Sequence, residues 1–268
     1  MRSTKGCRIF TCLLFSFVVG AAGADDVQRP PRTIRVAAYD DAGVSRSLLE
    51  VLAVLDQYPD VAYERIKANA IREGKLADYD VLIHPGGSGS KQAGSLEESG
   101  RDRVREFVDG GGGFVGICAG SYLASSDYSW SLHILDAKVV DRAHWARGHG
   151  DVQIRLTDAG KKLLECDEDL QTILYYQGPL LAPADKPEVP DYEPLATYET
   201  EIAKNGAPEG VMKGTTAIAA GSFGKGRVVC FSPHPEKTEG LGRFVHLAVR
   251  WAAGIGDLQL APSLNPEP

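Results

Sequence analysis

The sequence predicts an α/β fold in which helices cover both faces of a central, mostly parallel sheet. Short apolar runs typical of buried strands lie at residues 33–39, 61–66, 81–84 and 114–117. Apolar residues at helical spacing fill the intervals, at residues 44–58, 71–76 and 96–108. Alternating strand and helix patterns indicate parallel strands joined by right-handed crossovers. We therefore expect a flavodoxin-like three-layer sandwich.

The strand pattern at 114–117 leads directly into Cys118, which we predict to be a nucleophile on a sharp strand-to-helix turn, a nucleophile elbow. Gly116 and Gly120 flank the cysteine. Such a turn needs small neighbours because its backbone is strained and its side chain must stand clear. The helix behind it would favour a thiolate and would aim the N–H of Ala119 at a developing oxyanion. The alternative is a buried structural cysteine, which does not explain glycine on both sides.

A cysteine nucleophile needs a histidine base, and the base needs an acceptor that orients it. His234 follows the last predicted core strand, at 227–231, and stands between two prolines, with Glu236 two residues further on. Open α/β sheets keep their sites at this carboxyl edge. The alternative is a solvated loop histidine. The glycine-rich loop after the strand at 81–84 offers a second oxyanion donor, which we assign to the N–H of Gly87.

The chain is less regular after the predicted elbow. Further strands are expected at residues 152–156, 172–176, 194–198, 216–222 and 227–231, and further helices at 158–164 and 241–253. The turn at 223–226 would join the last two strands as a hairpin. The proline-rich, acidic stretch 179–194 is expected to be a surface loop.

The first 24 residues read as a signal peptide. Basic residues precede an apolar core at 9–19 that is too short to span a membrane as a stable helix, and Ala22-Gly23-Ala24 offers a cleavage site. A retained membrane anchor is the alternative. Cleavage after Ala24 predicts a secreted or periplasmic protein. It would leave a linker at 25–32, one domain at 33–254 and a tail at 255–268.

Charge and cysteine content limit the partners we expect. The formal net charge is −7, and the predicted signal peptide carries only basic charges, so the mature chain would be more acidic. An acidic chain gives no electrostatic reason to expect nucleic acid, or a membrane once the signal is removed. Cys118, Cys166 and Cys230 would remain after cleavage. This odd number fits one free functional thiol, with the other two either bridged or buried as thiols.

The three motifs together resemble the class I glutamine amidotransferase superfamily, whose triad is cysteine, histidine and glutamate. The chain resembles more closely the amidotransferase-like N-terminal domain of eukaryotic biotin–protein ligases and its free-standing bacterial relatives. The matching stretches are scattered along nearly the whole mature chain, at 36–47, 83–87, 112–125, 175–179 and 223–236. The resemblance implies Cys118 as nucleophile, His234 as base and Glu236 as its orienter, with the amides of Gly87 and Ala119 as oxyanion donors.

One residue departs from the amidotransferase pattern. True glutamine amidotransferases usually carry glutamine four residues after the nucleophile, and here Tyr122 stands there. The chain also resembles no synthetase that would receive ammonia, so we expect no glutaminase. The interpretation is an exported cysteine hydrolase or amidase that acts on an amide or peptide-like bond through a thioester. The alternative is a non-catalytic module that binds a small molecule or a protein in the same pocket.

Four residues are candidates for the substrate pocket: Gly86, Tyr122, Asp40 and Tyr176. The substrate itself and the oligomeric state are not predicted. His144 and His149 lie five residues apart, but no carboxylate or cysteine falls at ligand spacing beside them. We therefore expect a surface loop near the mouth of the site there, and we predict no metal and no cofactor.

Overall fold

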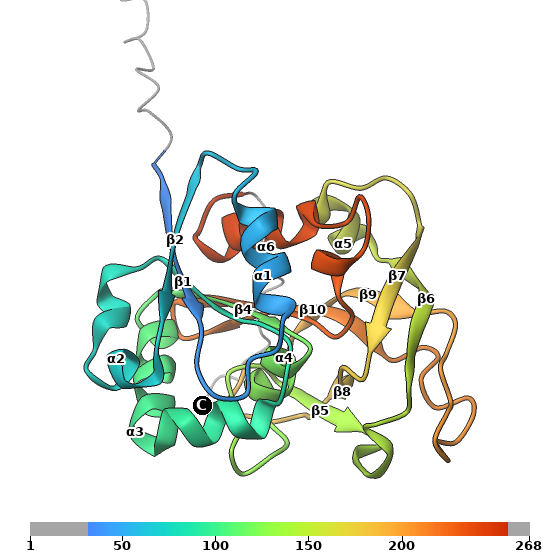
Figure 1. The fold of residues 1–268 in the computed structure, drawn as a ribbon. Coiled ribbons are helices and arrows are strands. Elements are labelled where there is room, and N and C mark those ends of the chain that lie inside the picture. The colour runs from blue at the N-terminus through green and yellow to red at the C-terminus, as the bar shows by residue number, and fades with distance from the viewer. Residues whose placement is uncertain (1–31, 257–268) are drawn as a thin grey trace, which may run out of the picture. The chain divides into compact units, whose positions relative to one another are not determined.

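The computed structural model describes residues 32–256, which form one mixed sheet covered by helices (Figure 1). The central part of the sheet is parallel and carries the site. In spatial order its strands are β2 (Val61–Ile66), β1 (Ile34–Tyr39), β3 (Val81–His84), β4 (Gly113–Ile117) and β11 (Gly226–Phe231). The predicted α/β fold with parallel central strands is confirmed.

The sheet continues from β11 as an antiparallel extension. Its strands are β10 (Thr216–Phe223), β9 (Glu193–Tyr198), β6 (His149–Leu156) and β7 (Leu170–Tyr176). A further strand, β8 (Leu180–Pro183), pairs with β10 and with β5 (Ala137–Val140). The sheet as a whole is therefore mixed. The predicted hairpin between 216 and 231 joins its parallel part, which ends at β11, to its antiparallel part, which begins at β10.

Helices cover both faces of the sheet, which gives three layers (Figure 1). One face carries α1 (Ser47–Leu55), α5 (Asp158–Leu164) and α6 (Arg243–Ala252). The other carries α2 (Ala68–Arg72), α3 (Gly89–Asp109) and α4 (Ala119–Ala124). Three short 3₁₀ helices complete the elements: η1 (Lys75–Asp78), η2 (Arg142–His144) and η3 (Pro235–Lys237).

The central strands β3 and β4 are apolar almost throughout because both of their faces are buried. In β3, Val81 and Ile83 belong to the core beneath α1 and α6, whereas Leu82 belongs to the core beneath α3. In β4, Val115 and Phe114 divide in the same way. This two-sided burial explains why these strands appear in the sequence as continuous apolar runs rather than as alternating patterns.

The prediction of a surface loop at 179–194 is wrong for the first part of this stretch. Leu180 and Leu181 are 2% and 0% exposed and form β8 with their neighbours.

Helix α3 also begins earlier than its predicted start at residue 96, and Glu97 interrupts it with a φ of 60°. Several glycines and serines in the first turns of α3 have low helix propensity, which hid this part of the helix in the sequence.

Some predictions concern residues outside the described range. The predicted signal peptide lies there, as do residues 25–31 of the linker and 257–268 of the tail. Within the part of the chain that the structure describes, no helix is both long enough and apolar enough to cross a membrane.

Candidate active site

The candidate site lies where the parallel strands end. Cys118 follows β4 directly, and His234 and Glu236 follow the neighbouring strand β11. The glycine-rich loop with Gly87 follows β3, on the other side of β4. Because parallel strands point the same way, their carboxyl ends bring these three segments to one edge of the sheet.

Cys118 has the strained backbone that the elbow requires. Its φ of 51° and ψ of −96° are unusual for a residue with a side chain. A Cβ at Gly116 would lie 2.6 Å from the backbone of Gly120, and a Cβ at Gly120 would lie 2.2 Å from the carbonyl oxygen of His84. The flanking glycines are therefore needed because β3, β4 and α4 approach one another closely at this turn.

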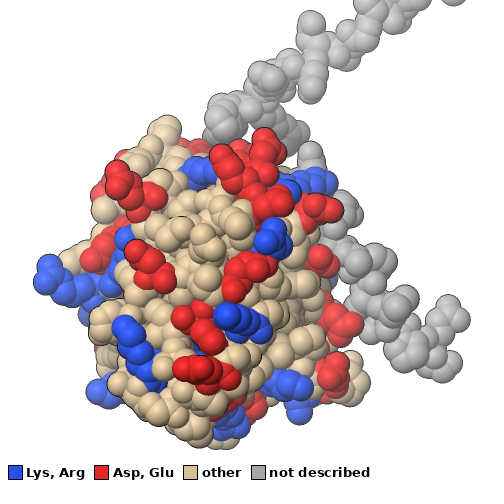
Figure 2. All heavy atoms as spheres, turned by 90° about the vertical axis from the view of Figure 1, so that its right-hand side faces the viewer, with Lys and Arg blue, Asp and Glu red and all other residues tan. Residues whose placement is uncertain are grey.

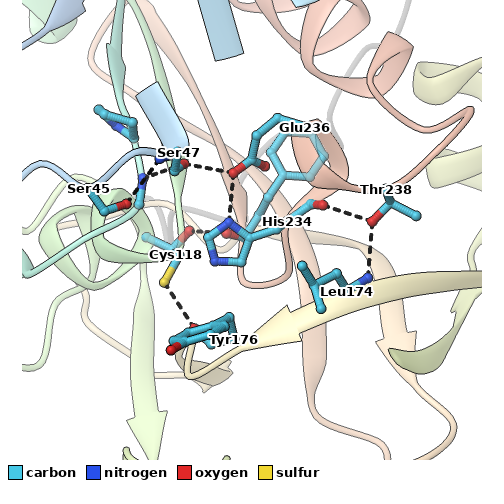
Figure 3. Close-up of polar contacts among 12 residues, drawn as sticks. Ser45, Ser47, Cys118, Leu174, Tyr176, His234, Glu236 and Thr238 are labelled. Carbon is cyan, nitrogen blue, oxygen red and sulfur yellow. Dashed lines mark hydrogen bonds and ion pairs between the residues drawn. The ribbon is translucent and has the colours of Figure 1, made fainter. Parts of the chain in front are cut away.

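A chain of hydrogen bonds orients the histidine ring (Figure 3). His234 Nδ1 lies 2.7 Å from Glu236 Oε1. The same carboxylate oxygen accepts a hydrogen bond of 2.7 Å from the hydroxyl of Ser47, which in turn accepts one of 3.2 Å from the N–H of Gly86. Ser47 was missed by the sequence analysis. It stands at the start of α1, far from Glu236 in the chain, and no local motif marks it.

The loop that carries His234 is also fixed to strand β7. The N–H of His234 donates to the carbonyl of Leu174 at 2.8 Å. The Thr238 hydroxyl donates to the carbonyl of His234 at 2.9 Å and accepts from the N–H of Leu174 at 3.0 Å (Figure 3). The ring is therefore held by its backbone as well as by Glu236.

The electrostatic setting favours a protonated His234. Burial by itself lowers the pKa of the ring, but the adjacent Cys118 and Glu236 side chains outweigh it and raise the pKa to about 10. His234 is 3% exposed, and its Nε2 has no hydrogen-bond partner among residues 32–256. The Cys118 thiol donates to the carbonyl of Tyr176 at 3.5 Å (Figure 3).

The two residues assigned as oxyanion donors lie on different segments, Gly87 in the loop after β3 and Ala119 directly after Cys118. Gly87 has a φ of +146°, and a Cβ there would lie 2.0 Å from the carbonyl oxygen of Gly43. The loops after β1 and β3 are joined at this point by the bonds Ser88 N–H to Gly43 O (2.7 Å) and Ser45 N–H to Gly86 O (2.9 Å). Within the described residues, the N–H groups of Gly87 and Ala119 make no hydrogen bond.

A cavity of about 700 Å³ opens at Cys118. Of the predicted site residues, Cys118, His234, Gly87, Tyr122 and Tyr176 line it. This volume fits a ligand of small-peptide size, since ligand pockets usually measure about 300–1,000 Å³.

Two predicted pocket residues lie elsewhere. Gly86 is not among the lining residues; it packs behind the histidine, because a Cβ there would lie 2.8 Å from His234 Cε1. Asp40 does not line the cavity either. Its carboxylate lies 2.8 Å from the guanidinium of Arg65 and 3.6 Å from the ammonium of Lys67, on strand β2 and just after it. Basic partners on a neighbouring strand hold this carboxylate away from the cavity.

Tyr122 fills the position that glutamine holds in true glutamine amidotransferases. Its hydroxyl donates to the carbonyl of Gln177 at 3.2 Å. Burial raises the pKa of this phenol well above its usual value, so the hydroxyl stays protonated and acts as a donor. The ring therefore forms a fixed part of the wall beside the thiol.

Comparison with known families identifies the first half of the domain. The family model described as "Biotin-protein ligase, N terminal" matches residues 34–144. Over these residues the chain is similar to this family. The matched part of the biotin–protein ligase N-terminal domain runs from β1 to η2 and includes Cys118 and Gly87, whereas His234 and Glu236 lie beyond it. No curated protein sequence matches the chain.

Solved structures share the fold at low sequence identity. A putative ThuA-like protein from Bacteroides uniformis aligns with a TM-score of 0.57 at 14% identity, covering 86% of this chain and 95% of that one. A putative GMP synthase component from Thermoplasma acidophilum gives 0.55 at 13%, covering 83% and 95%. PurLQS from Thermotoga maritima gives 0.55 at 15%, covering 81% and 97%. The fold is that of class I glutamine amidotransferase-like proteins.

Three histidines that do not belong to the proposed triad contact other side chains or are buried. His144 Nδ1 lies 2.6 Å from Asp141 Oδ1, and the ring of His149 stacks on that of Tyr176 at 4.7 Å. His84 is buried at the end of β3, and burial lowers its pKa to about 4. Among the residues described, no group of three or more His, Cys, Asp or Glu side chains could hold a metal ion.

The three described cysteines are all free and buried. Cys166 and Cys230 are therefore not bridged to each other. Of the two arrangements that the odd cysteine count left open, the structure has the one with two buried thiols beside Cys118.

Proposed function

We propose that this chain is an exported cysteine hydrolase or amidase that cleaves an amide or peptide-like bond through a thioester. The observation that supports this most is the strained Cys118 beside a histidine whose ring is oriented by a buried carboxylate at 2.7 Å. A nucleophile and a base at one cavity, with a group that orients the base, are the components of cysteine-based acyl transfer.

The proposed reaction uses only groups of this chain and water. The Cys118 thiolate attacks the carbonyl carbon, and the N–H groups of Gly87 and Ala119 bind the oxyanion that forms. The protonated His234 gives its proton to the leaving amine as the carbon–nitrogen bond breaks. Water then attacks the thioester while His234 accepts its proton, and the carboxylic acid and the free thiolate are released.

Glutamine is not the substrate that we propose. A phenol is longer than a carboxamide and cannot offer its paired donor and acceptor. The hydroxyl of Tyr122 is moreover bonded to the carbonyl of Gln177. A pocket for the glutamine side chain would therefore be reshaped or blocked.

A non-catalytic binding module is the second candidate. One observation favours it: the thiol of Cys118 donates to the carbonyl of Tyr176, and His234 Nε2 is without a hydrogen-bond partner in the described part of the chain. A protein that retained the pocket and lost the reaction could hold a ligand there without bond cleavage.

Hydrolysis of a panel of amides decides between the two functions. We expect slow or no ammonia release from glutamine, and turnover of at least one small amide or dipeptide that Cys118→Ala abolishes. Losing one member of a catalytic unit costs roughly 10³-fold or more in rate. Cys166→Ala is the matched control and should leave the rate unchanged. Glutamine hydrolysis that requires Cys118 would refute the argument from Tyr122. No turnover on any substrate, with ligand binding intact in Cys118→Ala, would favour the binding module.

A further inference from the structure

The wall of the cavity carries a charge pattern that differs from the rest of the molecule. Most arginines among residues 32–256 pair with a carboxylate or donate to a backbone carbonyl. On the face shown in Figure 2, acidic and basic side chains are correspondingly interspersed. The side chain of Arg46, on the cavity wall, has no hydrogen bond or ion pair with any described residue.

Lys237 joins Arg46 at the same cavity. Arg46 precedes Ser47, and Lys237 follows Glu236. The hydrogen bond of 2.7 Å between Ser47 and Glu236 therefore holds the backbones of the two basic residues near each other. Lys237 likewise has no ion-pair partner within residues 32–256. Among the described residues that line the cavity there is no aspartate and no glutamate, although the chain has a formal net charge of −7.

The start of α3 adds to this positive potential. Gly89 and Ser90, its first two residues, line the cavity, and within the described range no side chain caps the helix start at Ser88. Free N–H groups at a helix N-terminus favour anions. With the two unpaired basic side chains, they make this wall suitable for an anionic group.

Aromatic rings also line the cavity. Tyr128 stacks on Trp130 with ring centroids 4.6 Å apart, and Tyr122 lies tilted beside Tyr128 at 6.1 Å. Trp145 and Tyr176, which are 55% and 48% exposed, complete the lining. Large exposed aromatic side chains gathered at one cavity indicate a ligand with a flat or apolar part.

We infer that the ligand of this cavity is a peptide-like acid: an amide that carries a free carboxylate, held by Arg46 and Lys237, and an apolar or aromatic group that packs on the rings. The inference rests on the proposed function for the amide. The carboxylate is chosen because it is the anion that peptide-like molecules carry, and because guanidinium and ammonium groups bind it well.

Binding to the full mature chain with Cys118→Ala tests the inference, because this variant cannot carry out the proposed chemistry. Titration calorimetry would compare N-acetyl-L-phenylalanine with its neutral amide and with N-acetyl-L-alanine. The aromatic acid should bind about fivefold to tenfold more tightly than the neutral amide, as expected for two exposed ion pairs and a helix N-terminus. N-acetyl-L-alanine should bind more weakly than N-acetyl-L-phenylalanine, and added salt should reduce the preference for the acid.

Charge-removing variants identify the residues responsible. In the same Cys118→Ala background, Arg46→Gln and Lys237→Gln should each weaken binding of the aromatic acid by about twofold to fivefold. Lys213→Gln removes an exposed positive charge away from the cavity and should change nothing. Equal affinity for acid and amide, no effect of Arg46→Gln, or no binding of N-acetyl-L-phenylalanine at millimolar concentration would overturn the inference. The expected binding pattern without turnover by the wild-type protein would instead refute the hydrolase and leave the ligand class standing.

Discussion

Cys118 differs from the other two described cysteines in what surrounds its thiol. Burial raises the pKa of Cys230 to about 12, and burial with a hydrogen bond to Glu168 raises the pKa of Cys166. Cys118 instead lies beside a protonated histidine and at the start of α4. A neighbouring cation increases the reactivity of a cysteine toward alkylating agents.

We therefore expect iodoacetamide to modify Cys118 at least about tenfold faster than Cys166 or Cys230 near neutral pH. The rate should fall in His234→Ala. Because the protonated ring stabilises the thiolate, this advantage holds below the His234 pKa of about 10 and disappears as the ring loses its proton above that value.

Ser47→Ala should have an intermediate effect on the alkylation rate of Cys118 in the same experiment. It removes the second hydrogen bond to Glu236 Oε1 but keeps the one to His234. Peptide mapping by mass spectrometry would give the rate at each cysteine, and we expect Ser47→Ala to lie between wild type and His234→Ala. Equal rates in wild type and His234→Ala would show that His234 does not act on the thiol.

At the scale of residues, the sequence marked those candidate site residues whose signal lies in their immediate neighbours along the chain. Cys118 was marked by its glycines, and His234 and Glu236 by their prolines and their place after a strand. Ser47 acts through a contact between distant segments, which leaves no mark on its neighbours in the chain. Asp40 was expected in the pocket from its place after β1, but the basic residues of the adjacent segment pair with it.

At the scale of elements, the elbow depends on how closely α4 can approach β3 and β4. Gly120→Ala would place a methyl group 2.2 Å from the carbonyl oxygen of His84, which is backbone and has little room to move. We expect this variant to lower the free energy of unfolding by about 3 kcal/mol or more. Urea denaturation would measure it.

Gly94→Ala is the matched control for that experiment. Gly94 lies within α3, and a Cβ there would meet nothing within 4 Å. Alanine should raise the free energy of unfolding by about 0.5–1 kcal/mol, because it is the better helix former. A Gly120→Ala protein as stable as wild type would contradict the packing argument for the elbow.

Elements with a clear local pattern of apolar residues were the ones the sequence predicted best. The strand at 61–66 and the helix at 158–164 agree with β2 and α5, and the core strands β3 and β4 agree to within one residue. Strands β5 and β8 were missed because each is short and β8 lies in a stretch rich in proline. The two strands pair with each other, and a periodic pattern of apolar residues in the sequence does not indicate such a contact between distant segments.

At the scale of the whole molecule, the site combines two parts of the chain. The family match covers 34–144 and therefore contains Cys118, the proposed nucleophile, and the glycine-rich loop with Gly87. His234, the proposed base, and Glu236 come from the segment after β11, which reaches the same edge because β11 pairs with β4 in parallel. The antiparallel extension lies between these parts in sequence and supplies Tyr176 and the anchor for His234 through β7.

Export is a prediction about the whole chain. It rests on the predicted signal peptide and not on the residues of the candidate active site. Basic residues before the short apolar core, followed by Ala22-Gly23-Ala24, predict cleavage after Ala24 and a mature protein that begins at Asp25. Cleavage there would leave the folded unit that starts at Thr33 intact, because eight residues would still precede it. Mass spectrometry of the chain recovered from the periplasm or the medium should find Asp25 at its N-terminus.

Replacing Ala22 and Ala24 by bulky residues should block processing and retain the precursor, whereas Ala21→Leu, outside the cleavage motif, should not. Recovery of the chain from the cytoplasm with Met1 in place would refute the prediction.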